Sequence, residues 1–258
     1  MNNVFNVRRF SMLFKKHSIE HGNTYLLSTA VLIGLLFLSL GFFSYTSRGH
    51  LDSNAQTSTF IFFMLIGGSI FTSLTFLDLG DKKKSIPFLT LPASHTEKYL
   101  VAWIYSFVIF QLVFLGAFYL VANVIVAIGV TPANDRERVI NVFDPQQKTV
   151  MTFTIYALFH GLTIWGAIFF EKLHFIKTSF VFFIGLAIIL LINSQLLNLL
   201  IGKEAQGVPF QGMGINNNNH FWQISPDKDV TWYGWYIFKI TVLLLWTSAF
   251  FRLKEKEV

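Results

Sequence analysis

Six long apolar runs constrain this chain more than any other feature of its sequence. A helix that crosses the roughly 30 Å hydrocarbon core of a bilayer needs about 20 apolar residues. Only 13% of the chain is charged and 53% is hydrophobic, whereas soluble domains carry about 25% charged residues. A soluble fold of this composition would expose large apolar patches. We therefore expect an all-α integral membrane protein with six transmembrane helices, at about residues 25–46, 58–77, 99–130, 150–170, 177–201 and 232–252.

The 24 residues before the first run are polar and basic. Phe10, Leu13 and Phe14 fall on one face of a helix, and Arg9 and Lys16 fall elsewhere. This pattern suits an amphipathic helix in the membrane interface, and it also suits a helix that docks on a partner protein. The run that follows is too long for a signal peptide and lacks a small-residue cleavage site. We expect an interfacial amphipathic helix over residues 1–24 and a transmembrane domain over residues 25–258.

The distribution of charge predicts an orientation. The net charge of +6 lies between the apolar runs and forms no single basic face, so we expect no nucleic-acid partner. If the N-terminus is cytoplasmic, outer loops form at 131–149 and 202–231, and most basic residues lie on the cytoplasmic side. The positive-inside bias therefore favours cytoplasmic termini. In the second outer loop, the asparagine run at 216–219 reads as a flexible tip or as part of an external binding surface.

The predicted cytosolic loop at 78–98 has an unusual composition. It contains three consecutive lysines, two prolines and the sequence "SHTE" at 94–97. In a capping box, Ser94 accepts from the backbone N–H of Glu97, and the Glu97 side chain accepts from the N–H of Ser94. We therefore expect a helix that begins at about His95 and continues into the third span. The loop reads either as a capped connector with a lysine anchor or as a docking element for a cytosolic partner.

Motifs for catalysis are missing from the sequence. It has no G-x-x-x-x-G-K-[ST] phosphate-binding loop and no H-E-x-x-H zinc pair. His17 and His21 share a helical face, which we interpret as solvated, and two ligands alone make a poor metal site. His160 and Glu171 lie about 16 Å apart along a helix, too far for an acid–base pair. We expect no enzyme activity, metal or cofactor in this chain.

Polar residues inside the spans have two readings. They either line a substrate pathway or form hydrogen bonds between helices. The candidates for a pathway are Asn123, Asn193, Gln195, Asn198 and Lys239. Lys239 also reads as a lysine whose ammonium reaches up to the outer interface. A separate group of small residues predicts close helix packing by the second span, namely Gly67, Gly68, Ser69, Thr72 and Ser73.

Three segments resemble those of bacterial type-2 ABC transporter permeases. "LTLPASHTEKYLVAW" is similar to the "LLPAS-x-x-EKYL" segment of that family. "VRRFSMLFKKHSIEHGNTYLL" resembles the family's helix on the inner membrane face, and "FHGLTIWGAIFFEKLHFIKT" resembles its fourth span and following turn. The order of parts also agrees over nearly the whole chain. "NNNNHFW" in the second outer loop matches no family pattern.

The resemblance implies a function for the chain. It implies the transmembrane permease subunit of an ATP-driven exporter in a bacterial plasma (inner) membrane, with ATP and Mg²⁺ on a separate ATPase subunit. A second permease subunit, identical or homologous, would complete the pathway, and membrane lipid would surround it. By resemblance, the residues that would contact the ATPase are Asp81, Lys82, Lys83, Lys84, Ser85, Pro92, Ser94 and Glu97. The alternatives are a non-transport anchor or assembly subunit of another complex, and an intramembrane enzyme.

Overall fold

The computed structural model describes residues 5–76, 93–129, 139–144, 149–170, 173–201, 205–208, 212–217, 220–224 and 228–255. Within these ranges, six helices are long and apolar enough to cross a membrane, which confirms the predicted fold class. The third span is one continuous rod with a π-helical middle. The helices are α1 (Val7–Thr46), α2 (Ser53–Thr75), α5 (His95–Trp103) with η1 (Ile104–Ile109) and α6 (Phe110–Ile128), α7 (Thr149–Phe169), α8 (His174–Leu200) and α9 (Lys228–Glu255).

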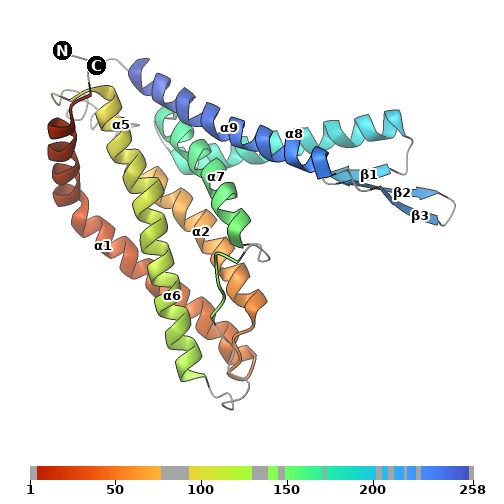
Figure 1. The fold of residues 1–258 in the computed structure, drawn as a ribbon, viewed down its shortest axis with the longest axis horizontal. Coiled ribbons are helices and arrows are strands. Elements are labelled where there is room, and N and C mark those ends of the chain that lie inside the picture. Colours follow the sequence, from red (N-terminus) through yellow and green to blue (C-terminus); the bar gives the residue numbers. More distant parts are fainter. Residues whose placement is uncertain are drawn as a thin grey trace.

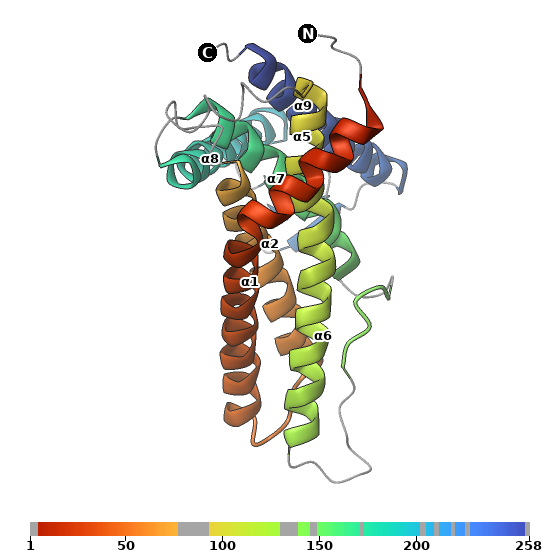
Figure 2. The same ribbon diagram turned by 90° about the vertical axis from the view of Figure 1, so that its left-hand side faces the viewer.

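The amphipathic segment and the first span form a single helix of 40 residues. The helix begins at Val7 because the Asn6 side chain accepts from the backbone N–H of Arg8 (2.9 Å) and of Arg9 (3.4 Å), as an N-cap does. The predicted boundary at residue 24 is therefore not a break in the helix. Figures 1 and 2 show α1 bending instead, so that its first part crosses the third span and its second part runs beside α2 and α6.

Helices α1, α2 and α6 form a column, with α7 against one side of α2 (Figure 1). Aromatic side chains fill its centre, and Phe60 packs on Phe114 and Phe118 with ring centroids 5.2 and 5.1 Å apart. A second buried cluster joins the end of α2 to α5, α7 and α9, at the end where α1 begins and α9 ends. It contains Phe76, Tyr99, Ala102, Ile164, Ala167, Ile168, Ala249 and Leu253.

The small-residue face of α2 packs as predicted. Gly68, Ser69, Thr72 and Ser73 are all buried. A Cβ on Gly68 would collide with Tyr156 of α7 and would lie 2.8 Å from Phe110. Small residues let α7 and the third span approach the α2 backbone closely. Gly67 is only partly buried and faces a different direction, toward Leu32 of α1.

Within the predicted outer loop at 202–231 lies a small antiparallel sheet, which the sequence did not predict. Its strands are β1 (Ala205–Val208), β2 (Gly212–Asn217) and β3 (His220–Ile224), in the order β1-β2-β3. Asn216 and Asn217 pair with Phe221 and His220 in the β2–β3 ladder. The first half of the asparagine run is therefore strand rather than flexible tip. Asn218 and Asn219 lie outside the described residues.

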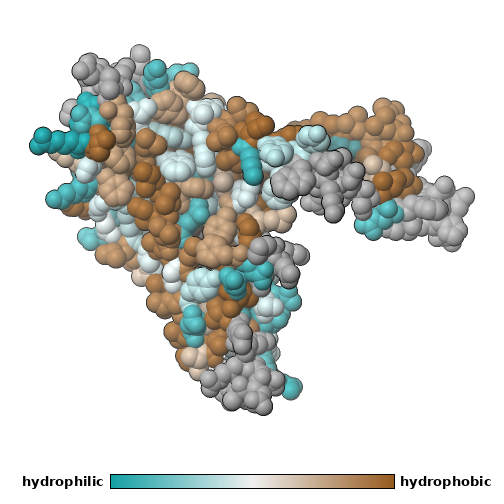
Figure 3. Space-filling view, in the orientation of Figure 1, coloured by the Kyte–Doolittle hydropathy of each residue, from teal (hydrophilic) through white to brown (hydrophobic). Residues whose placement is uncertain are grey.

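Helix α8, the sheet and the start of α9 project sideways from the column (Figure 1). Only 6% of the apolar window of α8 is buried, against 50% for α7. Its surface is brown in Figure 3, whereas teal residues gather near the beginning of α1. A helix that is apolar on its exposed faces belongs in lipid or against another membrane subunit.

Candidate functional site

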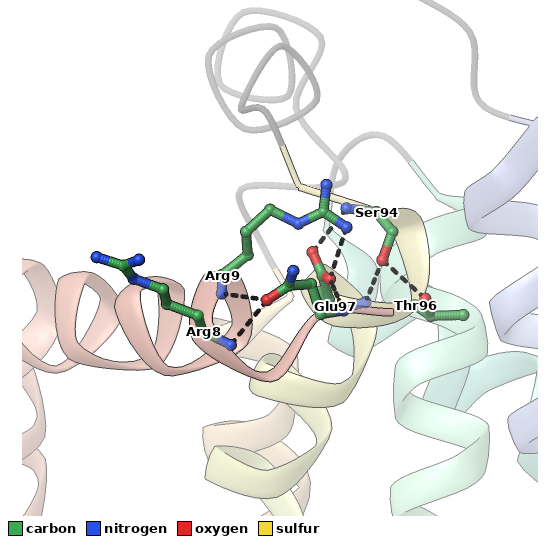
Figure 4. A network of polar contacts seen from close by, with 6 residues as sticks. Arg8, Arg9, Ser94, Thr96 and Glu97 are labelled. Atoms are coloured by element: carbon green, nitrogen blue, oxygen red, sulfur yellow. Dashed lines mark hydrogen bonds and ion pairs between the residues drawn. The ribbon is translucent and has the colours of Figure 1, made fainter. Parts of the chain in front are cut away.

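The carboxylate of Glu97 joins the beginning of α1 to the beginning of the third span (Figure 4). Its Oε1 accepts from the backbone N–H of Asn6 at 2.7 Å and from Arg9 Nη2 at 3.1 Å. Glu97 is fully buried, and the Arg9 side chain is 32% exposed. The ion pair is therefore shielded from water on the carboxylate side, and it fixes two segments that lie 91 residues apart in the chain.

The same carboxylate also completes the predicted capping box. Its Oε2 accepts from the backbone N–H of Ser94 at 2.9 Å, and Ser94 Oγ accepts from the N–H of Glu97 at 3.2 Å. Ser94 Oγ lies 2.8 Å from Thr96 Oγ1. Helix α5 thus begins at His95, as the sequence predicted. One side chain both starts the third span and holds α1 against it.

A cluster of rings lies one to four turns further along α1. Phe14, His17 and Tyr25 of α1 surround Tyr105 of η1, with centroids 4.8, 4.6 and 5.4 Å from its ring. His17 Nε2 lies 2.6 Å from Tyr25 Oη, and Ser18 Oγ hydrogen-bonds to Tyr105 Oη. The interpretation of His17 as a solvated residue was wrong, because the bend in α1 lays this face on the third span.

Three spans meet at a buried polar cluster around the π-helical turn. Ser106 Oγ of η1 lies 2.9 Å from His160 Nε2 of α7, and Trp246 Nε1 of α9 donates to His160 Nδ1 at 3.2 Å. Tyr156 Oη donates to the Ser106 carbonyl at 2.8 Å. A π-turn disturbs the regular ladder of helical hydrogen bonds, so its carbonyl groups can accept from side chains of neighbouring helices.

The bonding pattern of this cluster assigns the proton on His160. An indole N–H can only donate, so Nδ1 accepts and Nε2 carries the hydrogen, which it donates to Ser106 Oγ. Ser106 Oγ in turn donates to the Ala102 carbonyl at 2.8 Å. Ser106 and His160 are both fully buried. The serine proton points to its own helix and not to the imidazole, so the geometry suits a link between helices rather than an activated nucleophile.

Most of the predicted contact residues for an ATPase lie outside the described residues, namely Asp81, Lys82, Lys83, Lys84, Ser85 and Pro92. Glu171, the residue weighed against His160 as an acid–base partner, also lies outside them. Ser94 and Glu97 are described. Both belong to the junction between α1 and α5, which is the set of bonds that Glu97 makes with Asn6, Arg9 and Ser94 (Figure 4).

The predicted pathway residues are distributed over separate surfaces. Asn123 is exposed and donates to the carbonyl of Tyr119 in its own helix at 2.7 Å. Asn193 of α8 donates to the Gly207 carbonyl of β1 at 2.8 Å, which holds the sheet against the helix. Gln195 and Lys239 are exposed, and Asn198 is partly buried. The pathway assignment therefore stays a prediction, and Asn193 has a visible structural role.

Several residues that matter here were missed from the sequence. The sequence near Asn6 and Arg9 does not indicate their contact with Glu97, and that near Ser106 and Trp246 does not indicate contact with His160. The role of Asn6 as a helix N-cap could have been predicted, because an asparagine just before an amphipathic run is a good N-cap. The long-range contacts themselves have no local pattern.

The six apolar helices define this chain as a multi-pass membrane protein. In the part of the chain that the structure describes, no group of three or more His, Cys, Asp or Glu residues could hold a metal ion. Comparison with protein-family models, curated proteins and solved structures finds no match to this chain.

Proposed function

We propose that this chain is the transmembrane permease subunit of an ATP-driven ABC exporter. The observation that carries the proposal is the buried Glu97 carboxylate, which ties the amphipathic part of α1 to the first turn of α5, at the end of the predicted loop at 78–98. The resemblance of "LTLPASHTEKYLVAW" to the contact segment of type-2 permeases supports it from the sequence. Two permease subunits, the same or homologous, form the pathway in a bacterial plasma membrane with cytoplasmic termini.

The junction suggests how force would pass into the membrane. A separate ATPase subunit, which carries ATP and Mg²⁺, docks on the loop at 78–98 and moves it when ATP binds. Glu97 accepts from the backbone N–H of Asn6, before α1, and from that of Ser94, before α5. The start of α1 and the start of α5 therefore move together. The third span then carries that movement to η1, a π-helical turn of the kind that is frequent at functional sites.

The test is an affinity pull-down from mildly solubilised native membranes. The proposal expects an ATPase subunit with a phosphate-binding loop to co-purify with the wild-type chain. A variant with Lys82, Lys83 and Lys84 changed to Ala is expected to lose it. Lys177→Ala with Lys254→Ala is the matched control, because both lysines are exposed on the same predicted side and lie outside the amphipathic helix.

Two results would count against the proposal. If no ATPase accompanies the wild-type chain, the reading as an anchor or assembly subunit takes its place. If an ATPase co-purifies equally with the triple variant and with the control, its docking surface lies elsewhere than the lysine loop.

A further inference from the structure

A long groove runs along the column between α1, α2 and the third span. Its volume is about 650 Å³, and its walls are almost entirely apolar. Leu32 of α1 and Phe63, Gly67 and Phe71 of α2 contribute partly buried positions, and Phe110 of α6 is buried. Leu27, Val31, Phe62 and Ile70 stand along its edges with 68, 53, 56 and 43% of their surfaces exposed. The groove therefore opens sideways, to whatever surrounds the column.

We infer that this groove binds one acyl chain of a membrane phospholipid. All three of its walls belong to helices that are long and apolar enough to span a bilayer, so the medium at its open side is hydrocarbon. Along α1 the lining extends from Tyr25 to Leu35, about 15 Å at the helical rise. That length is half of the roughly 30 Å hydrocarbon core, the depth of one leaflet.

The two ends of the groove differ in polarity, as the headgroup and the acyl chain of a lipid do. At one end the lining includes Tyr25, Ser28, Thr29 and Tyr105, and the other end, near Leu35 and Val113, is purely apolar. The hydroxyl groups of Tyr25 and Tyr105 bond to His17 and Ser18, and so tie this end of the groove to the ring cluster. The polar end is the end nearer the basic first turns of α1, which carry Arg8, Lys15 and Lys16, while Arg9 is paired with Glu97. Basic residues at a membrane surface attract anionic headgroups. A phospholipid in this orientation puts its headgroup by the ring cluster and its chain along the groove.

Gly67 lines the groove without a side chain and so leaves room for an acyl chain. A Cβ at this position would meet only Leu32 Cδ1, at 3.8 Å, so a small side chain fits and a large one would fill the groove. Gly34 on α1 offers a matched control, since it is exposed, has nothing within 4 Å of a Cβ and does not line the groove. The inference does not depend on transport, because any membrane subunit with this column would hold the same lipid.

The experiment uses the full chain in nanodiscs that contain a phosphatidylglycerol with a diazirine halfway along one acyl chain. After irradiation, the cross-linked peptides are mapped by mass spectrometry. We expect the label to concentrate on residues 27–35 and 62–74. Gly67→Phe is expected to lower labelling there by about tenfold, the equivalent of about 1.4 kcal/mol, while Gly34→Phe leaves it unchanged.

A second readout is the phospholipid that stays bound in detergent, counted by native mass spectrometry. Wild type and Gly34→Phe are expected to keep one tightly held phospholipid that Gly67→Phe loses. Should Gly67→Phe fail to give a monodisperse protein, Val31→Trp at the exposed edge of the groove tests the same point.

Three outcomes overturn the inference. One is equal labelling of α8 and of the groove, since α8 is the least buried of the six helices and a specific site should be labelled more than an exposed apolar surface. Another is labelling that neither Gly67→Phe nor Val31→Trp reduces. The third is a cross-link between the groove and a peptide from a second copy of the chain, which would make the groove a protein interface.

Discussion

At the scale of single residues, the Glu97 carboxylate binds three donors from three different residues. It accepts from two backbone N–H groups and from Arg9, and it is fully buried. A buried donor left without its acceptor costs more than the bond itself contributes, because water cannot replace the lost partner. The partly exposed Arg9 side contributes less, since solvent screens it.

We predict that Glu97→Gln lowers the free energy of unfolding by about 1–3 kcal/mol. The amide keeps one acceptor oxygen but turns an N–H₂ group toward one of the three donors. Thermal unfolding in one detergent measures the change. Glu255→Gln is the control, because Glu255 pairs with Arg252 on the surface with 64% of its side chain exposed. Equal stability of the two variants would mean that the junction does not hold α1 in place.

The buried Ser106–His160–Trp246 cluster leads to a second prediction. Ser106→Ala removes the acceptor of the His160 Nε2 proton, and hydrogen bonds between membrane helices are worth about 0.6–2 kcal/mol. We expect a loss of that size in thermal unfolding. Trp246→Phe is expected to be less than additive with it, because both changes act on one imidazole. Thr247→Ala, whose hydroxyl bonds only to carbonyls of α9, is the control, and a loss as large as that of Ser106→Ala would contradict the prediction.

At the scale of elements, two adjacent glycines of α2 face different surroundings. Gly68 lies against Tyr156 of α7 and Phe110 of α6, and Gly67 lies beside the groove. We predict that Gly68→Ala destabilises the fold by about 1–3 kcal/mol through overpacking. Gly67→Ala should stay within about 0.5 kcal/mol of wild type. Thermal unfolding of the two variants, prepared side by side, checks the difference. If both behave alike, the α2–α7 contact is loose enough to admit a methyl group at Gly68.

The third span shows how an element can be predicted in outline and still differ in detail. Its start at His95 follows from the local spacing of Ser94 and Glu97. Its π-helical turn at Ile104–Ile109 contains no proline or glycine, so the sequence does not indicate an irregular helix there. That turn depends on partners from other helices, such as the Tyr156 hydroxyl group on the Ser106 carbonyl.

At the scale of the whole molecule, the start of α1 and the end of α9 lie at the same end (Figures 1 and 2). An even number of spans requires this arrangement. Which side of the membrane that end faces is predicted from charge alone, by the positive-inside rule.

We predict that Lys15→Cys and Lys254→Cys resist a membrane-impermeant maleimide in intact spheroplasts and react after permeabilisation. Asn54→Cys and Gln223→Cys, both at exposed positions of the opposite predicted side, should react without permeabilisation. The chain has no cysteine of its own, so each variant carries a single label site. The reverse pattern would invert the topology and move the lysine loop outside.

The sequence by itself determined the features that depend on neighbours along the chain. Six apolar runs predict six spans because a helix satisfies its own backbone, and only the length and polarity of each run decide whether it suits a bilayer. The capping box was predictable for the same reason, since its two residues lie three apart in the chain. The small-residue face of α2 followed from helical spacing.

Only the tertiary structure decided which distant segments meet. Glu97 bonds to Asn6 across 91 residues, and Ser106 lies beside His160 across 54. The sheet at 205–224 was missed because its glycines and asparagines favour turns, and its ladder forms only when three short segments align. The groove exists because the bent α1 stands beside α2 and the third span. Contacts of this kind depend on the packing of whole helices, and no local pattern of residues encodes that packing.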